Sequence, residues 1–230
     1  MSDFIHLHNH TDYSLLDAAQ SIDMMSDRLA DIDMDTIAVT EHGNLFSLIP
    51  FYKNAIKKFT QALLLNSSEA KVYYYLGKSY IYIDKKKQAL ESLIMSIKLD
   101  RYNGDAHFEL GKIYESVLKI NLALEEYRLA DKYIDNHDLN YTYGILLYKE
   151  QLYNKALLPL REFIIYKPNN IPVLEAMGNI FISESRFKEA IDTYKRIREK
   201  YPEKLDINLF LAESYYKLKE YEKAIDIYGE

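Results

Sequence analysis

The stretch that decides the fold is Leu110–Ala130, LGKIYESVLKINLALEEYRLA. A leucine and Gly111 come first, and Ala123 and Ala130 follow at helical spacing on the far side of a short polar turn. A Gly or Ala on one helix lets the backbone of the next helix approach, while aromatic residues fill the space beside it. The stretch therefore predicts two short antiparallel helices in close contact.

The same arrangement recurs along the chain at a nearly constant period. The small residue stands at Gly77, Gly111, Gly144, Gly178 and Ala212, in steps of 34, 33, 34 and 34 residues. An alanine follows each of them twelve residues later, at Ala89, Ala123, Ala156, Ala190 and Ala224. Self-similarity at this period predicts a mainly α-helical solenoid of stacked helix pairs.

This pattern resembles the tetratricopeptide repeat (TPR), with its Leu-Gly, Tyr, Ala, aromatic, Ala and Pro positions. The register places a half repeat at 54–69, repeats at 70–103, 104–136, 137–170 and 171–204, and a partial repeat at 205–230. The resemblance implies an α–α superhelix over 54–230 whose concave groove holds a peptide or a partner protein. Neither end supplies a polar capping face, so we expect the array to be part of a longer solenoid.

Groove residues follow from the family's ligand-facing positions on the first helix of each repeat. The resemblance places there Tyr74, Lys78, Tyr82, Phe108, Lys112, Tyr141, Tyr148, Lys149, Tyr216 and Lys217. An aromatic and lysine lining suits an extended segment with apolar anchors and acidic flanks. The alternative, that these tyrosines only pack the repeats, stays open. Nothing in 54–230 suggests catalysis or a cofactor, and we interpret His107 and His137 as surface or turn residues.

The start of the chain has a different character. In Phe4–Asp17, FIHLHNHTDYSLLD, alternation places three histidines on one face of a predicted strand. A helical pattern follows Ser21, and Thr36–Thr40 predicts a second, buried strand that ends before Glu41 and His42. Imidazoles on adjacent same-face positions are suitable ligands for zinc, manganese or iron. The segment therefore predicts a strand, helix, strand (βαβ) unit with a metal site at its strand ends.

The segments HLHNHTDYSLLDAA (6–19) and IAVTEHGNLF (37–46) are similar to the opening of the PHP (polymerase and histidinol phosphatase) domain. The likeness is greatest to its form in the bacterial DNA polymerase III alpha subunit. It implies part of an α/β barrel with metal-dependent phosphoesterase or exonuclease activity. The metal ligands it implies, for zinc or manganese, are His8, His10, Asp17 and His42, with His6 and Glu41 as further candidates.

Only part of that barrel is present in the sequence. The family completes its metal cluster with later Glu, His and Asp-x-His residues, whereas this chain has no histidine between His42 and His107. One βαβ unit cannot close a seven-stranded barrel and leaves its strand edges unpaired. We therefore expect 1–53 to be a truncated PHP-like segment without activity, and the polymerase core is lacking.

The composition of the chain indicates which kinds of partner are expected. The net charge is −6, but residues 1–53 alone carry nine acidic and two basic residues, so the remainder is nearly neutral. That balance argues against a nucleic-acid partner. The chain has no cysteine, no secretory signal pattern and no apolar run of about 20 residues, which predicts a cytoplasmic protein without a membrane segment.

Three functional hypotheses follow. The first is a protein–protein interaction scaffold that binds a peptide or partner protein in its groove and carries an inactive PHP segment. The second is a metal-dependent phosphoesterase or exonuclease of the PHP family. In the third, the likeness to the DNA polymerase III alpha subunit reflects ancestry in DNA replication and not activity.

Overall fold

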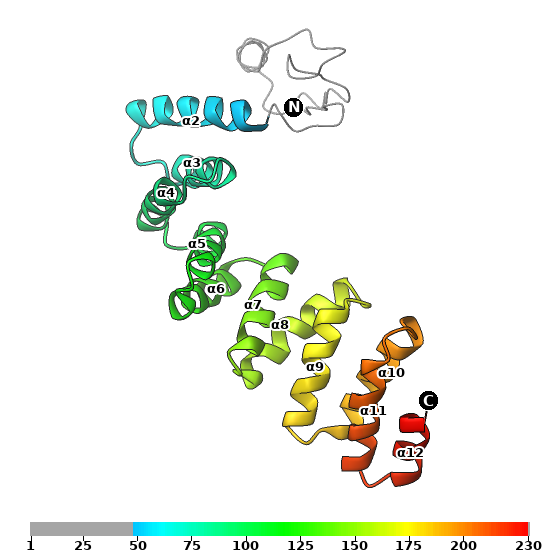
Figure 1. Ribbon diagram of the computed structural model, residues 1–230. Helices are drawn as coiled ribbons and strands as arrows, with labels where there is room; N and C mark the ends of the chain where they lie inside the picture. Colours follow the sequence, from blue (N-terminus) through cyan, green and yellow to red (C-terminus); the bar gives the residue numbers. More distant parts are fainter. Residues whose placement is uncertain (1–47, 230) are drawn as a thin grey trace, which may run out of the picture. The chain divides into compact units, whose positions relative to one another are not determined.

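The computed structural model describes residues 48–229 (Figure 1). This part of the chain contains eleven helices, labelled α2 to α12, and no strand. The chain divides into two compact units, 1–113 and 114–230. The predicted βαβ unit and its candidate metal ligands lie outside the described residues. None of the helices between 48 and 229 is long and apolar enough to cross a membrane.

Helix α2 is followed by five helix pairs. The bounds are α2 Leu48–Leu65, α3 Ala70–Tyr82, α4 Lys86–Leu99, α5 Gly104–Ser116, α6 Ile120–Tyr133, α7 His137–Lys149, α8 Tyr153–Tyr166, α9 Ile171–Ser183, α10 Phe187–Lys200, α11 Asp206–Lys217 and α12 Tyr221–Gly229. In the second unit α7 packs on α8, α9 on α10 and α11 on α12, and each pair also contacts the one before it. The predicted helical repeat is confirmed for these residues.

Helix α2 extends further toward the N-terminus than the sequence suggested. It begins at Leu48, so the predicted junction between residues 53 and 54 falls inside one continuous helix. Its aromatic side chains contact α3: Tyr52 stacks on Tyr82 at 4.2 Å between ring centroids, and Phe59 lies 6.0 Å from Tyr75. The part of α2 before residue 54 therefore packs with the repeats.

Close approach at a glycine is a feature of three of the helix pairs. An added Cβ at Gly77 would lie 2.8 Å from Leu93 Cγ, and one at Gly144 would lie 2.7 Å from Leu160 Cδ2. At Gly178 it would lie 2.6 Å from Cζ of Tyr194. These distances leave no room for a methyl group, so glycine is required where the second helix of the pair crosses the first.

In the fifth pair Ala212 stands at the position of the glycine, and α11 still packs on α12. Tyr228, sixteen positions later, is 57% exposed, whereas its counterparts Leu93, Leu160 and Tyr194 are all fully buried. Tyr228 lies in the last turn of the described helices, and the counterparts lie in helices that a further described pair follows.

The turn inside each pair uses a left-handed backbone residue that is not glycine. The five residues are Asp84, Leu118, Gln151, Ser185 and Lys219, with φ between 55° and 66°. At the second turn the N–H of Leu118 donates to the carbonyl of Glu115 (3.0 Å) and that of Lys119 donates to the carbonyl of Tyr114 (2.9 Å). These bonds satisfy carbonyl groups at the helix end and reverse the chain in three residues.

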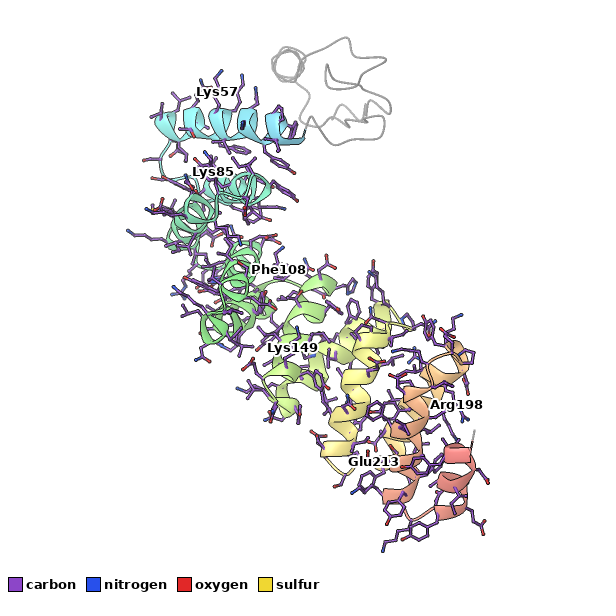
Figure 2. All side chains as sticks on the ribbon, viewed as in Figure 1. Lys57, Lys85, Phe108, Lys149, Arg198 and Glu213 are labelled. Carbon is purple, nitrogen blue, oxygen red and sulfur yellow. The ribbon has the colours of Figure 1, made fainter. Side chains whose placement is uncertain are left out.

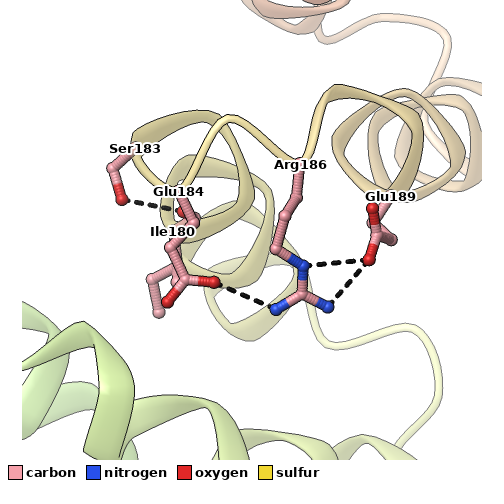
Figure 3. Close-up of polar contacts among 5 residues, drawn as sticks. All are labelled: Ile180, Ser183, Glu184, Arg186 and Glu189. Atoms are coloured by element: carbon pink, nitrogen blue, oxygen red, sulfur yellow. Dashed lines mark hydrogen bonds and ion pairs between the residues drawn. The ribbon is translucent and has the colours of Figure 1, made fainter.

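An arginine reinforces one of these turns. Figure 3 shows Arg186 between Glu184, which ends α9, and Glu189 in the first turn of α10. Its Nη1 lies 3.0 Å from Glu184 Oε2 and its Nε lies 2.9 Å from Glu189 Oε1, while the guanidinium carbon is 4.5 Å from the centroid of Phe181. The guanidinium lowers the pKa of the Glu189 carboxyl by this hydrogen bond. The α9–α10 turn is therefore fixed by charge as well as by backbone bonds.

The structure corrects one sequence-based interpretation, that of His107, and it contains one helix with an internal proline. His107 is not a surface residue: it is 4% exposed, and its Nε2 lies 3.2 Å from the carbonyl oxygen of Arg101, because the α4–α5 loop covers the start of α5. That interpretation was wrong. Pro159 lies inside α8 and is buried, yet α8 continues to Tyr166, since one missing N–H does not end a helix that is packed on a neighbour.

We predict that Gly178→Ala lowers the free energy of unfolding by up to about 2 kcal/mol. The helix propensity of alanine favours the variant by about 1 kcal/mol, but overpacking against the fully buried Tyr194 costs about 1–3 kcal/mol. Urea unfolding followed by circular dichroism measures the difference. Gly229→Ala is the matched control because nothing lies within 4 Å of its added Cβ. Equal stability of the two variants would contradict the packing account.

Candidate protein-interaction surface

The candidate surface lies on the first helix of each pair, α3, α5, α7, α9 and α11. We call the predicted ligand-facing positions on these helices the A-helix face. The face is described separately in each unit, because the first unit ends at Ile113. Its side chains are drawn in Figure 2.

In the first unit the face repeats one pairing of an aromatic ring with a lysine four residues later. Lys78 Nζ lies 5.4 Å from the Tyr74 ring centroid, and Lys112 Nζ lies 4.8 Å from that of Phe108. Lys112 also pairs with Glu109 at 2.8 Å. Phe108 is only 6% exposed, so it offers a ligand little surface of its own and mainly supports the lysine above it.

The environment of Tyr74 is acidic as well as enclosed. Burial raises the pKa of its phenol strongly, and the nearby carboxylates of Asp105 and Glu109 raise it further. The hydroxyl of Tyr74 therefore keeps its proton well above neutral pH and stays a hydrogen-bond donor. The lysines of this unit are thus balanced locally by carboxylates from α5.

Tyr82 is the most exposed of the predicted aromatics in the first unit, at 51%. It stacks against Tyr52 with an interplanar angle of 9°. Burial, followed by the nearby Tyr82, raises the pKa of Tyr52 to about 12. Sequence reasoning missed Tyr52 because it assigned residues before 54 to the other segment.

In the second unit a chain of hydrogen bonds joins three helices. Asn179 Nδ2 donates to the hydroxyl oxygen of Tyr148 (2.9 Å), and the Tyr194 hydroxyl donates to Asn179 Oδ1 (2.7 Å). Tyr141 lies seven residues before Tyr148 on the same helix, α7, and its ring centroid is 5.1 Å from that of Phe163. The orientation of Tyr148 on the face is therefore set by α9 and α10.

Carboxylates gather beside this chain. Burial raises the pKa of Tyr194 strongly, with further contributions from Tyr148, Glu213 and Glu175. Glu175 is paired with Lys204, and Glu213 lies on α11 (Figure 2). In the last two repeats the face therefore changes from lysine to carboxylate and amide groups.

Sequence reasoning missed Glu175, Asn179 and Glu213. They stand at the repeat positions of Tyr74 and Lys78, and they would have been found if the same positions had been read in the fourth and fifth repeats. The prediction relied on aromatic and basic residues at these positions, so it did not include the carboxylate and amide groups.

The remaining predicted residues lie at the exposed ends of their helices. Tyr216 is 57% exposed, with its ring 5.4 Å from that of Tyr221, and Lys149 and Lys217 are exposed. The structure thus joins Tyr74 to Lys78, Phe108 to Lys112, and Tyr148 to Asn179. It does not join Tyr216 to another predicted residue.

Metal binding was predicted for a different part of the chain. Between residues 48 and 229 no group of three or more His, Asp and Glu residues could hold a metal ion. His6, His8, His10, Asp17, Glu41 and His42 lie outside the described residues. Zinc or manganese binding by them stays a prediction.

Comparison with known families finds matches to both parts of the chain. The PHP domain matches residues 6–137, and the tetratricopeptide repeat matches residues 181–230. The first match extends past the expected end of the likeness near residue 55 and covers α2 to α6, where the described chain is helical. Since it covers more than half of the residues, the chain belongs to the PHP domain family.

Curated relatives fall into two groups. The DNA polymerase III alpha subunit of Borreliella burgdorferi is 54% identical over 56 residues, which are 24% of this chain and 5% of that protein. The Helicobacter pylori subunit is 30% identical over 127 residues, 50% of this chain and 10% of that protein. The BBSome complex member BBS4 of Bos taurus is 28% identical over 149 residues, 64% of this chain and 28% of that protein. The chain thus spans less than a third of each of these relatives.

Solved structures confirm the helical repeat. YrrB, described as a TPR protein with an unusual peptide-binding site, superposes with a TM-score of 0.66 at 21% identity, over 75% of this chain and 89% of that one. MamA AMB-1 superposes with a TM-score of 0.59 at 23% identity, over 70% and 88%. At these identities the likeness establishes the fold.

The raised pKa of Tyr194 predicts a loss of stability in alkali. Above the ordinary tyrosine pKa near 10 the unfolded chain loses this proton while the folded chain keeps it, so the free energy of unfolding falls as pH rises. Tyr194→Phe should be less stable at pH 8, because Asn179 loses a partner, and should show a shallower decline between pH 10 and 11. Urea unfolding at each pH measures this. Tyr228→Phe, which alters an exposed hydroxyl, should keep the full slope, and a wild-type slope in Tyr194→Phe would contradict the prediction.

Proposed function

We propose that the chain is a protein-interaction scaffold that binds an extended segment of a partner protein along the part of the A-helix face in the second unit, on α7, α9 and α11. The observation that carries the proposal is the chain of hydrogen bonds from Tyr148 through Asn179 to Tyr194, which fixes the orientation of side chains on the face. A surface ordered in advance loses less conformational entropy on binding. Such a surface suits recognition.

The chemistry of the face indicates the kind of segment. Half-buried rings such as Tyr141 and Tyr148 can receive apolar or aromatic anchors, and the exposed Lys149 and Lys217 can meet acidic flanks. The similarity in fold to YrrB, which is described as having a peptide-binding site, supports this use of the repeats. The array needs no cofactor, and a protein partner is favoured over nucleic acid because residues 54–230 are nearly neutral.

A peptide selected on the purified chain tests the proposal. Peptides isolated from a random phage-displayed library against the full chain are synthesised, and their affinity is measured by fluorescence polarisation. Tyr141→Ala should weaken binding by about tenfold, the loss of one aromatic contact. Tyr102→Ala is the control, because it removes the ring of an exposed tyrosine that lies in the α4–α5 loop and not on a first helix. Circular dichroism shows whether each variant stays folded. Equal affinity of both variants for every selected peptide would count against the face.

A second candidate function rests on the family match. The PHP domain match and the 54% identity over 56 residues to a polymerase subunit support a metal-dependent phosphoesterase or exonuclease. His8, His10, Asp17 and His42 would then hold zinc or manganese, which would activate a water molecule for attack on phosphorus. We favour an inactive segment, because the ligands that complete the family's cluster are absent from the sequence.

Metal content separates these two functions. For an inactive segment, elemental analysis and calorimetry with Zn²⁺ and Mn²⁺ should give the same weak, substoichiometric binding for the chain and for a His8→Ala/His42→Ala variant. Binding of one or more ions per chain that the double variant abolishes would contradict inactivity and favour the phosphoesterase. Hydrolysis of a phosphodiester substrate would then be measured with both proteins.

A further inference from the structure

A separate hollow lies at the end of the α7–α8 pair. Its volume is about 480 Å³, and none of its lining residues belongs to the A-helix face as predicted from the sequence. It is lined by Asp135, His137, Asn140, Glu162, Ile165 and Tyr166. All of them belong to the second unit and lie within one repeat or the loop before it.

One wall of the hollow is aromatic and ordered. The rings of His137, at the start of α7, and Tyr166, at the end of α8, stack at 4.0 Å between centroids and 10° between planes. Ile165 beside them is 80% exposed. A flat group could therefore rest against this wall and cover apolar surface as it does so.

Asn140 is the polar group in the hollow whose bonding is incomplete. It is 4% exposed, yet its side-chain amide makes no hydrogen bond with any described residue. The nitrogen and oxygen atoms of this amide are not completely enclosed by protein. The small exposed part of Asn140 therefore faces the hollow that the residue lines. Buried amides are normally hydrogen-bonded, and a ligand in the hollow would supply the missing partner.

The charged groups around Asn140 determine whether the hollow favours a cationic or an anionic ligand. Asp135 and Glu162 contribute carboxylates, while the ammonium of Lys167 is placed over the rings of Tyr166 (5.5 Å) and Phe163 (5.9 Å). The first N–H groups of α7, which would attract an anion, already donate to Asn136 Oδ1 at 2.8 Å and 3.2 Å. The hollow therefore favours a cation.

We propose that this hollow binds a guanidinium group. A guanidinium is planar and can lie on the His137–Tyr166 stack, and its five N–H donors can reach two carboxylates and the oxygen of Asn140 together. An ammonium has only three donors on a point charge and gains less from a flat wall. The proposal stands independently of the function of the A-helix face.

The test is a titration of the full chain with arginine methyl ester, followed by nuclear magnetic resonance of the His137 ring and the Asn140 side-chain amide. We expect saturable shifts at both residues with a dissociation constant of about 1 mM, as for a small fragment. In citrulline methyl ester an uncharged urea group of the same shape replaces the guanidinium, so this ester should produce no saturable shift. Absence of a shift with the arginine ester, or equal shifts with citrulline, would overturn the proposal.

Substitution of the carboxylate tests the site itself. Glu162→Gln keeps the shape of an exposed side chain, so the fold is preserved, and it should weaken binding by about tenfold through loss of a charge-assisted contact. Glu199→Gln on α10 is the matched control and should bind as the wild type does. Unchanged affinity in Glu162→Gln, with the control also unchanged, would overturn the assignment to this hollow.

The source of the guanidinium is distinguished by a second ligand. Acetyl-Gly-Arg-Gly-amide presents the same side chain within a peptide backbone. Binding about tenfold tighter than that of the free ester would assign the site to an arginine of a partner protein, and similar affinities would assign it to free small molecules as well. Failure of both ligands would overturn the proposal.

Discussion

The absence of a side chain at one position of the repeat is the constraint on which the structure depends. At Gly77, Gly144 and Gly178 the second helix of the pair lies so close that an added Cβ would be within 3 Å of a buried side chain. The backbone geometry of the pair follows from this contact, because a larger residue would push the helices apart.

That contact also positions the candidate surface. The ring of Tyr194 fills the space beside Gly178 and, through its hydroxyl, holds Asn179 and then Tyr148. Packing and the proposed recognition are thus linked by one side chain, because the hydroxyl end of Tyr194 both packs against Gly178 and donates to Asn179. The orientation of the face is therefore a consequence of the fold.

Much of the fold could be predicted from the sequence, because small residues at a period of 33 or 34 report directly on helix packing. The turns could not, since the left-handed residues Asp84, Leu118, Gln151, Ser185 and Lys219 share no chemistry, and their conformation is imposed by the helices on either side. The burial of His107 also depends on a loop contact that no periodicity shows. At the candidate surface the prediction included aromatic and basic residues, and their role in binding stays a prediction. It did not include Glu175, Asn179 and Glu213, because these residues keep the spacing of the repeat but have a different chemistry.

The most direct test of the account is hydroxyl-radical footprinting of tyrosines in the full chain, with and without a saturating selected peptide. The account predicts slower oxidation of Tyr141, Tyr148 and Tyr216 on α7 and α11 in the presence of peptide. It predicts no change at Tyr228, which is as exposed as Tyr216 but lies on the second helix of its pair. Protection of Tyr228 with unchanged oxidation of the other three would contradict the account and place recognition on the second helices.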